Sequence, residues 1–429
     1  MVSIEQIVSL AKRRGFVFPG SEIYGGLANT WDYGPLGARM LQNIKSLWWN
    51  RFVERRDDIF PVETGIIMNP KAWEASGHLA NFTDPLVECR SCHKRFRADH
   101  VEGNKCPECG GELTDAKNFN LMFKTFIGPV EAQGSEVYLR PETAQGMFVN
   151  FKNILTTERP TLPFGIAQIG KAFRNEITPG NFIFRTLEFE QMEIEYFVHP
   201  ERWEAVFEEW KDEMWKWLVS IGADESKLKW RAHEKEELSH YSKRTEDVEF
   251  EFPFGWGELY GLAYRGDFDL KNHSEKSGEE LVYEDPETGE KITPHVVEPT
   301  FGVNRTFLML LASAYTEDEG RVYLKLDPKV APYKVAVFPL VANKPELVKK
   351  AEEIYFKLKL ELPTVFDDRG NIGKRYYAQD EIGTPWCITV DYQTLEDNTV
   401  TIRDRDTMEQ ERINTNELKD ELDKRLGVG

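Results

Sequence analysis

The sequence is poor in cysteine and histidine, and it has no long apolar run. Of its 429 residues, 5 are cysteine and 8 are histidine. So few cysteines exclude a small scaffold built on disulfides. No apolar stretch is long enough to cross a membrane. The first residues lack a basic region followed by an apolar core. We therefore expect no secretory signal and a cytoplasmic location.

An excess of positive charge is also missing. The chain has 54 lysines and arginines against 73 acidic residues, a formal net charge of −19. A protein that binds nucleic acid mainly through its overall charge carries the opposite sign. Any RNA partner would therefore meet local basic patches on an acidic body. With 41% hydrophobic and 30% charged residues, the composition is typical of a soluble globular protein with room for two or three domains.

Four of the five cysteines lie in one short segment. Cys89 and Cys92 form one C-x-x-C pair, and Cys106 and Cys109 form a second after thirteen residues. This spacing suits a tetrahedral zinc site made of four thiolates, which would be structural because no coordination position stays open. Two disulfides are one alternative, which a reducing cytoplasm disfavours, and a cluster that has lost its metal is a second. Cys387 lies in an apolar run, and we expect it to be a buried, inert thiol.

Two arginines stand beside acids and aromatics at the edges of apolar segments. Arg174 precedes Asn175 and Glu176, and Arg305 follows the run 298–304 and opens an apolar helix. A guanidinium is a planar fork that suits a phosphate. Two of them, remote in the chain, would hold both ends of a triphosphate. For Arg174 and Glu176 alone, a surface ion pair on a strand is the alternative.

These two segments resemble motifs 2 and 3 of the class II aminoacyl-tRNA synthetases. Three further segments, 31–37, 140–146 and 255–259, resemble the glycyl-tRNA synthetases. Five motifs in the same order make the resemblance specific, and it runs almost end to end. It implies an α+β catalytic domain built on an antiparallel sheet, with a zinc-ribbon-like insertion. A C-terminal α/β anticodon-binding domain with a mixed sheet would follow.

The resemblance and the sequence pattern together predict the domain boundaries. We expect the catalytic domain over 1–330, with a zinc-binding insertion over 86–115 and a helical insertion over 200–244. The tryptophans of the helical insertion recur at helical spacing, and we expect them in a core rather than stacked on RNA. The anticodon-binding domain is expected over 331–429, where apolar strands alternate with helical patterns.

The apolar spacing predicts a helix near the N-terminus and another at the C-terminus. Residues 36–56 form a long amphipathic helix by their apolar spacing. This helix resembles motif 1, the dimerisation element of the class II enzymes, and so implies a homodimer; an ordinary core helix is the alternative. Residues 413–426 are predicted as the final helix.

The resemblance implies a ligase that activates glycine with ATP to glycyl-adenylate and then transfers glycine to the 3' end of tRNA(Gly). The attacking carboxylate is already ionised, so the site must align the reactants and neutralise phosphate charge. Arg174 would bind the α-phosphate, and Arg305, at a helix start, the γ-phosphate. Glu176 would accept from the adenine amino group, and Phe189 would stack on adenine. The other residues implied to bind ATP are Asn175, Phe184, Arg185, Glu258 and Leu259.

Glycine has no side chain, so recognition must hold its ammonium group and exclude any Cβ. An ammonium carries three donors and requires several acceptors. By resemblance, Glu142, Glu193 and Glu298 supply them and Thr300 helps to close the pocket. Bulk rejects larger amino acids, and no editing domain is expected. Arg97 matches a family position that approaches the substrate, although an exposed basic residue is the alternative.

Two further ligand sites follow from the resemblance. Glu258 and Glu298 are the candidate carboxylates for Mg²⁺, which bridges phosphates in such sites. Arg369 and Lys374 lie in segments that resemble the anticodon-binding domain and are the candidate tRNA contacts there.

Three positions depart from the usual family pattern. Leu187 stands where an arginine is common, Thr300 replaces a serine, and Asn304 stands where aspartate or glycine is usual. Leu187 would remove one phosphate contact, and the methyl group of Thr300 would tighten the exclusion of alanine. A different function would be a non-catalytic accessory or regulatory subunit that binds nucleic acid. Such relatives typically lose the phosphate-binding arginines, which this chain keeps.

Overall fold

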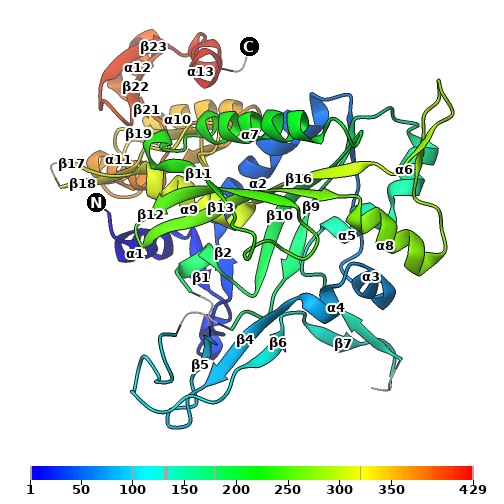
Figure 1. Ribbon diagram of the computed structural model, residues 1–429. Helices are drawn as coiled ribbons and strands as arrows, with labels where there is room; N and C mark the ends of the chain where they lie inside the picture. The colour runs from blue at the N-terminus through cyan, green and yellow to red at the C-terminus, as the bar shows by residue number, and fades with distance from the viewer. Residues whose placement is uncertain (1, 99–100, 130–133, 178–179, 319, 428–429) are drawn as a thin grey trace.

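The computed structural model describes residues 2–98, 101–129, 134–177, 180–318 and 320–427. Its centre is a seven-stranded sheet with the order β11-β12-β13-β16-β10-β9-β3 (Figure 1). Neighbouring strands are antiparallel except β3 and β9, which are parallel, so the expected antiparallel sheet is confirmed. The strands are β3 (Ile59–Pro61), β9 (Phe164–Phe173), β10 (Glu188–Val198), β11 (Leu228–Ala232), β12 (Arg244–Phe252), β13 (Gly255–Gly266) and β16 (His295–Gly302).

The two faces of this sheet differ because side chains alternate along each strand. Met192, Tyr260 and Phe301 belong to the main hydrophobic core, together with residues of three helices that cover this face. These helices are α2 (Pro35–Trp49), α7 (Trp203–Ser220) and α9 (Val303–Ala314). Residues one position along the strands, such as Glu193 and Thr300, point to the other face. That face is the one free to hold a polar site.

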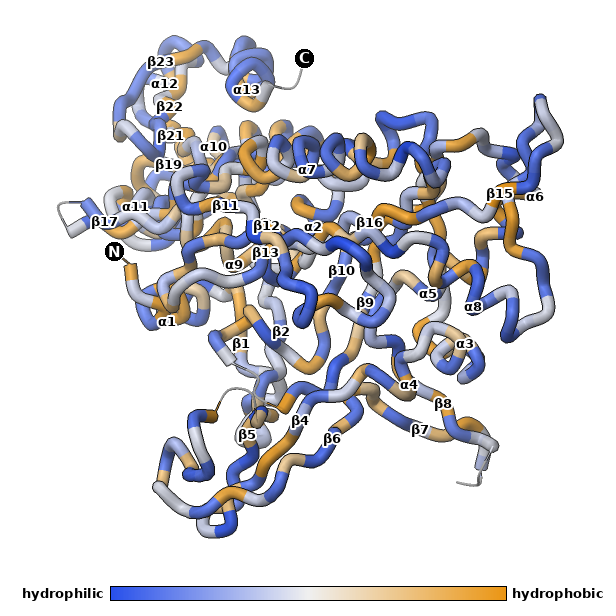
Figure 2. Tube along the Cα trace, in the orientation of Figure 1, coloured by the Kyte–Doolittle hydropathy of each residue, from blue (hydrophilic) through white to orange (hydrophobic). Residues whose placement is uncertain are grey.

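The segment 200–244 is not the helical insertion that we expected. It contains α7 and then β11, which pairs with β12 at the edge of the central sheet. The tryptophan spacing correctly predicted a helix with core residues, since Trp210 and Trp217 are buried. Figure 2 shows hydrophobic and hydrophilic residues alternating along α7 as it runs beside the sheet. Five residues of β11 were too few for their alternation to stand out in the sequence.

The helix predicted over 36–56 is confirmed in its main part. It runs from Pro35 to Trp49 and continues as a wider helical turn over Asn50–Glu54. Leu36, Met40 and Ile44 are buried on its inner side. Proline at the first helical position suits this start, because its missing N–H has no helical partner there.

The cysteine-rich segment belongs to a small separate sheet with the order β5-β4-β6. Its strands are β4 (Thr83–Glu88), β5 (Arg95–Arg97) and β6 (Lys117–Asn120). β5 pairs antiparallel with β4, and residues 99 and 100 lie outside the described part. Figure 1 shows this sheet projecting from the body of the protein.

The C-terminal region has a five-stranded sheet of its own, with the order β20-β19-β21-β22-β23. Two pairs are parallel and two antiparallel, so the expected mixed sheet is confirmed. The strands are β19 (Val335–Pro339), β20 (Thr364–Phe366), β21 (Trp386–Val390), β22 (Thr399–Asp404) and β23 (Gln410–Asn414). The helices are α10 (Pro345–Lys359), α11 (Ile372–Ile382), α12 (Tyr392–Asp397) and α13 (Leu418–Leu426).

The final helix was predicted to start at residue 413, and this start is wrong. Residues 410–414 form β23, which pairs with β22, and α13 begins only at Leu418. The Ile413 side chain packs against the hydrophobic core of the C-terminal region. One apolar residue cannot distinguish the end of a strand from the start of a helix, and sheet pairing decided between them.

Shorter elements complete the fold. The helices among them are α1 (Ile4–Arg14), α3 (Pro70–Ala75), α4 (His78–Asn81), α5 (Ala144–Val149), α6 (Phe151–Thr157) and α8 (Phe268–Ser277). The strands pair as β1 (Val17–Pro19) with β2 (Trp31–Tyr33), β7 (Lys124–Phe126) with β8 (Glu136–Tyr138), β14 (Tyr283–Glu284) with β15 (Lys291–Ile292), and β17 (Tyr315–Asp318) with β18 (Arg321–Leu324). Among the described helices, none combines the length and apolar character needed to span a membrane.

Candidate active site

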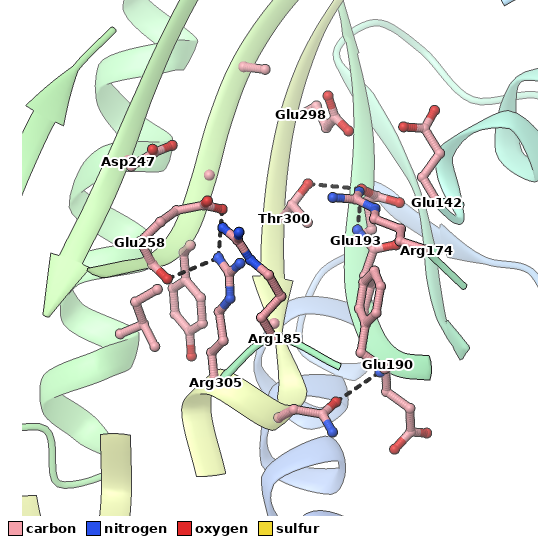
Figure 3. Close-up of a pocket in the computed structure, with 18 of the residues that line it drawn as sticks. Glu142, Arg174, Arg185, Glu190, Glu193, Asp247, Glu258, Glu298, Thr300 and Arg305 are labelled. Carbon is pink, nitrogen blue, oxygen red and sulfur yellow. Dashed lines mark hydrogen bonds and ion pairs between the residues drawn. The ribbon is translucent and has the colours of Figure 1, made fainter. Parts of the chain in front are cut away.

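A cavity lies on the face of the central sheet opposite α7, and it brings the two predicted arginines together. Arg174, just after β9, and Arg305, in the first turn of α9, both line it. Figure 3 shows two groups of side chains in this cavity with Thr300 between them. We call the group of Arg185, Glu258 and Arg305 the arginine end. We call the group of Glu142, Glu193 and Glu298 the acid end. Glu176, Phe184, Phe189 and Leu259 also line the cavity, as expected of ATP-binding residues.

The arginine end is held together by Arg305. Its Nη1 donates to the Glu258 carbonyl at 2.9 Å and lies 2.9 Å from a Glu258 carboxylate oxygen. Its guanidinium carbon lies 4.6 Å from the ring centroid of Phe184. Desolvation opposes ionisation of Glu258, but the neighbouring Arg305 outweighs it and lowers the pKa of Glu258. The Glu258 side chain is 49% exposed and that of Arg305 21%, so a ligand can reach both charges.

Arg174 lies near the acid end with few polar partners of its own. Its Nε donates to the Pro141 carbonyl at 3.1 Å. Its guanidinium lies over two rings, 5.4 Å from the centroid of Phe82 and 5.2 Å from that of Phe189. Aromatic faces orient a guanidinium without neutralising it. Within the part of the chain that the structure describes, Arg174 therefore keeps donors free for an anion inside the cavity.

The acid end is connected by hydrogen bonds across several elements. The Glu193 carboxylate accepts from the Thr300 hydroxyl at 2.9 Å and from the Thr143 hydroxyl. The Glu142 carboxylate accepts from the Gln145 amide at 3.0 Å, and its other oxygen lies 3.2 Å from Nε2 of His78. These bonds fix the direction of both carboxylates.

Arg265 on β13 is the cation behind the acid end, and the sequence analysis missed it. Its side chain is fully buried and donates to Glu298 at 3.0 Å and to both carboxylate oxygens of Asp269 at 2.7 and 2.8 Å. It also lies 3.8 Å from Glu142. A signal existed, because an arginine directly follows the run from Leu259 to Tyr264, which has no charged residue, and buried arginines are rare unless they are paired.

The pKa values of Glu142 and Glu298 at the acid end, and of the neighbouring Glu195, shift in different directions. Burial and the nearby charge of Glu298 raise the pKa of Glu195 well above its usual range, and both of its buried oxygens lack a hydrogen-bond partner among the described residues. Burial also raises the pKa of Glu298, although Arg265 opposes this. Burial would raise the pKa of Glu142 too, but His78 and Arg265 outweigh it and lower that pKa. The raised pKa values of Glu195 and Glu298 favour their neutral forms, which lowers the electrostatic cost of grouping these carboxyls.

The proposed magnesium pair of Glu258 and Glu298 is not supported by the geometry. Glu298 pairs with Ala263 in the sheet register, five residues along β13 from Glu258. At ~3.3 Å per residue this separates the two backbones by about 16 Å. One ion cannot bind both carboxylates across that distance, and Glu298 is already bound to Arg265. The exposed carboxylate of Glu258 alone remains suited to Mg²⁺.

Two predicted ligands do not line the cavity. Arg97 lies in β5 of the small sheet, where its Nη1 is 3.0 Å from an Asp84 oxygen. Asn175 lies next to Arg174, but its backbone N–H donates to the Leu121 carbonyl at 2.8 Å, and its side chain is not part of the cavity wall. Both positions were implied by resemblance, and the fold brings neither to this cavity.

The three departures from the family pattern have different structural roles. Leu187 lies outside the cavity wall, and its carbonyl accepts from the Arg174 backbone at 3.0 Å. The Asn304 side chain donates to the Tyr33 hydroxyl at 2.6 Å and accepts from the Glu190 backbone at 2.9 Å. Asn304 therefore ties the start of α9 to β10. Thr300 lines the cavity at the acid end and binds Glu193.

The four clustered cysteines converge as predicted. Their sulfur atoms all lie within 4.8 Å of one another, with Sγ of Cys89 3.4 Å from that of Cys109 and Sγ of Cys92 3.7 Å from that of Cys106. Backbone N–H groups of Ser91 and Cys92 point to the Cys89 sulfur. Such spacings and donors suit four thiolates around one tetrahedral ion. Cys387 is buried, as predicted.

Comparison with known proteins agrees with this geometry. Residues 127–314 match the family model described as tRNA synthetase class II core domain (G, H, P, S and T), and residues 334–425 match the anticodon binding domain. The glycine–tRNA ligase of Caldanaerobacter subterraneus is 51% identical over 458 aligned residues, which cover 99% of both chains. The chain belongs to the glycine–tRNA ligase family.

Other relatives and a solved structure extend the comparison. The glycine–tRNA ligase of Alkaliphilus oremlandii is 52% identical, covering 99% of this chain and 98% of the relative. That of Bacillus cereus is 50% identical over 99% of this chain and 100% of the relative. A prolyl-tRNA synthetase from Cryptosporidium parvum, complexed with halofuginone and AMPPNP, aligns with a TM-score of 0.71 over 99% of this chain and 77% of that chain. At 17% identity it shows the class II fold alone.

Proposed function

We propose that this protein activates glycine with ATP and transfers the glycyl group to tRNA(Gly). The observation that carries the proposal is a single cavity with partly exposed arginines at one end and buried carboxylates at the other. The arginines suit the triphosphate of a nucleotide, and the carboxylates suit the ammonium group of an amino acid that has no side chain. Membership in the glycine–tRNA ligase family supports the same activity.

The reaction needs alignment and charge neutralisation rather than a general base. The glycine ammonium would bind among Glu142, Glu193 and Glu298, which leaves its carboxylate toward Arg174. Arg174 would then hold that carboxylate against the α-phosphate and stabilise the charge that develops on it. Arg305 would bind the far end of the triphosphate. When bound with ATP at Glu258, Mg²⁺ would neutralise part of the phosphate charge.

The test is pyrophosphate exchange into ATP with glycine, alanine or serine as the only amino acid. We expect exchange with glycine, much weaker exchange with alanine and none with serine. Preference for serine would refute the amino-acid assignment. No exchange with any of them, by folded and zinc-loaded protein, would favour the accessory-subunit alternative, against which the retained Arg174 and Arg305 argue.

We also propose a structural zinc ion at Cys89, Cys92, Cys106 and Cys109. The converging sulfurs support it, and metal analysis of purified protein tests it. We expect about one zinc per chain, and loss of that zinc together with local unfolding of residues 86–115 in Cys109→Ser. Protein that contains no zinc but is folded in this segment would contradict the proposal.

The C-terminal region would bind the anticodon of the tRNA. Arg369 supports this because its side chain is 87% exposed and, within the described part of the chain, forms an ion pair with Asp367 alone. Lys374 is exposed on the first turn of α11.

We further propose that two copies associate through α2 as a homodimer in the cytoplasm, which sedimentation analysis of the purified chain can test. The domain boundaries of 1–330 and 331–429 remain part of the same proposal.

A further inference from the structure

Asp247 lines the cavity but belongs to neither the arginine end nor the acid end. It lies on β12, directly opposite Gly261 of β13, and its side chain is almost fully buried. A buried carboxylate is costly unless partners satisfy its oxygens. Figure 3 shows Asp247 on the same side of the cavity as Glu258, separate from the acid end.

His233 satisfies one oxygen of this carboxylate and sets its direction. Nε2 of His233 lies 2.6 Å from Oδ2 of Asp247. An ionised carboxylate can only accept, so Nε2 carries the proton and donates it. The backbone N–H of His233 donates to the Thr245 carbonyl at 3.0 Å, which anchors the imidazole beside β12. With Oδ2 engaged, the orientation of Oδ1 is determined as well.

Oδ1 of Asp247 faces an open space above Gly261. A Cβ built on Gly261 would have Oδ1 at 3.6 Å as its single neighbour within 4 Å among the described residues. The backbone of Gly261 is not in the left-handed region, so its conformation does not require glycine. A glycine inside a strand often marks a place where a ligand approaches the backbone closely. The missing side chain therefore leaves room for a ligand group beside Oδ1.

The sheet register places this space next to the predicted glycine site. Asp247 pairs with Gly261, Gly261 with Thr300, and Thr300 with Glu193, so these four residues form one row across four strands. Neighbouring strands lie about 4.8 Å apart, so Asp247 is about 10 Å from Thr300 along this row. An adenylate whose aminoacyl group lies at Thr300 and Glu193 would extend its sugar over the intervening strand, at Gly261.

We propose that Asp247 accepts a hydrogen bond from a ribose hydroxyl of ATP above Gly261, and that His233 is the positioning residue that orients it. The inference rests on the proposed function and names a further contact of the same site. A ribose hydroxyl is a neutral donor of the size that fits beside Oδ1 without a side chain at Gly261. The competing role is that of a magnesium ligand together with Glu258, which also faces this side of the cavity.

The test compares ATP with 2'-deoxy-ATP and 3'-deoxy-ATP in glycine-dependent pyrophosphate exchange without tRNA. The absence of tRNA excludes the sugar of its terminal nucleotide as the group that binds. We expect the unaltered protein to prefer ATP over at least one analogue by on the order of 10- to 100-fold in kcat/KM, because the analogue leaves a charged acceptor unpaired.

Asp247→Ala should remove that preference. Its kcat/KM for ATP should fall by the same factor, and its value for the disfavoured analogue should stay within about threefold of the unaltered protein. His233→Phe should lower the preference partially, since the carboxylate remains but loses its orientation. Asp247→Asn keeps the size of the side chain, and it replaces the alanine variant in this test if the alanine variant melts at a lower temperature. Glu251→Gln is the matched control, a charge removal on the same strand outside the cavity wall, and should keep the preference.

Several results would overturn the proposal. An unchanged preference in Asp247→Ala, or no preference in the unaltered protein, would show that Asp247 does not bind the sugar. Equal losses with ATP and both analogues that excess Mg²⁺ restores would assign Asp247 to the metal instead. Absence of exchange with ATP in the unaltered protein would reject the proposed function, and this inference with it. Exchange by the unaltered protein, together with the same preference for ATP over the analogues in Asp247→Ala, would reject the inference alone.

Discussion

The charged side chains at the two ends of the cavity differ in their partners and in their exposure. At the acid end, Arg265 is fully buried and bound by carboxylates of the protein itself, and Glu193 is held by two hydroxyls. At the arginine end, Arg305 is partly exposed and rests on a carbonyl, an aromatic ring and the accessible carboxylate of Glu258. The acid end is therefore complete before substrate arrives, whereas the arginine end keeps charge available for a ligand.

The sizes of the two proposed ligand groups, an ammonium and a triphosphate, would account for this difference. A glycine ammonium is small and can be selected only by a rigid hole of fixed shape, so its acceptors must not move. A triphosphate is large and highly charged, and its own charge can order flexible arginines when it binds. We expect substitutions at the acid end to affect folding as well as activity, and those at the arginine end to affect activity alone.

The largest effect is expected when the buried cation is removed. Arg265→Leu would leave Glu298 and Asp269 without their partner inside the protein, and breaking a buried ion pair in this way costs about 3–5 kcal/mol. Urea unfolding followed by tryptophan fluorescence measures the loss. Arg231→Leu is the control, because its ion pair with Glu237 is exposed and should contribute less than about 1 kcal/mol. An equal loss of unfolding free energy in both variants would contradict the proposed difference between the two ends of the cavity.

Arg174→Ala should act on catalysis and leave folding intact. Its guanidinium has one carbonyl and two aromatic rings as partners, so little stability depends on it. Loss of a donor to the developing phosphate charge should lower kcat of glycine-dependent exchange by about 10²- to 10³-fold, or ~2.7–4 kcal/mol. The unfolding midpoint should stay unchanged. Arg369→Ala is the control, which should keep exchange but weaken tRNA charging; equal losses in both assays would contradict the domain assignment.

Glu195→Gln should change how stability depends on pH. The pKa of Glu195 is raised in the folded state by burial and by Glu298, so the folded protein binds a proton that the unfolded chain releases above pH ~4.5. Stability is therefore lost as pH rises from that value toward the raised pKa. The variant cannot titrate there, and its slope between pH 5.5 and 8 should be smaller by up to about 1.4 kcal/mol per pH unit. Denaturant unfolding at several pH values measures this, and an unchanged slope would place the proton elsewhere.

The smallest effect is expected at the boundary between the two ends. Thr300→Ser keeps the hydroxyl that donates to Glu193 and removes one methyl group from the cavity wall. Discrimination against alanine should fall by about tenfold, because one methyl group in a pocket changes selectivity by that order. Exchange with alanine relative to glycine measures it, with Thr401→Ser on β22 as the control. A variant that discriminates as well as the unaltered protein would show that other groups exclude the Cβ.

The local chemistry of the cavity was largely predictable from the sequence. Arg174 and Arg305 stood in motifs that imply phosphate binding, and four cysteines at paired spacing indicated one metal centre. Asp247, His233 and Arg265 were not predictable in the same way. Each is separated in the chain from the residues it meets, and no spacing pattern connects His233 to the Asp247 carboxylate or Arg265 to Glu298.

By itself, the sequence determined the alternation of strands, the main part of the helix that follows Gly34, and the four clustered thiols. These depend on neighbours in the chain, where propensity and periodicity act. Only the tertiary structure decided that β11 joins the central sheet, that Glu258 and Glu298 lie too far apart for one ion, and that Asp247 faces the glycine of the next strand. The register between strands sets such pairings, and register depends on how whole sheet faces pack against helices rather than on any local run of residues.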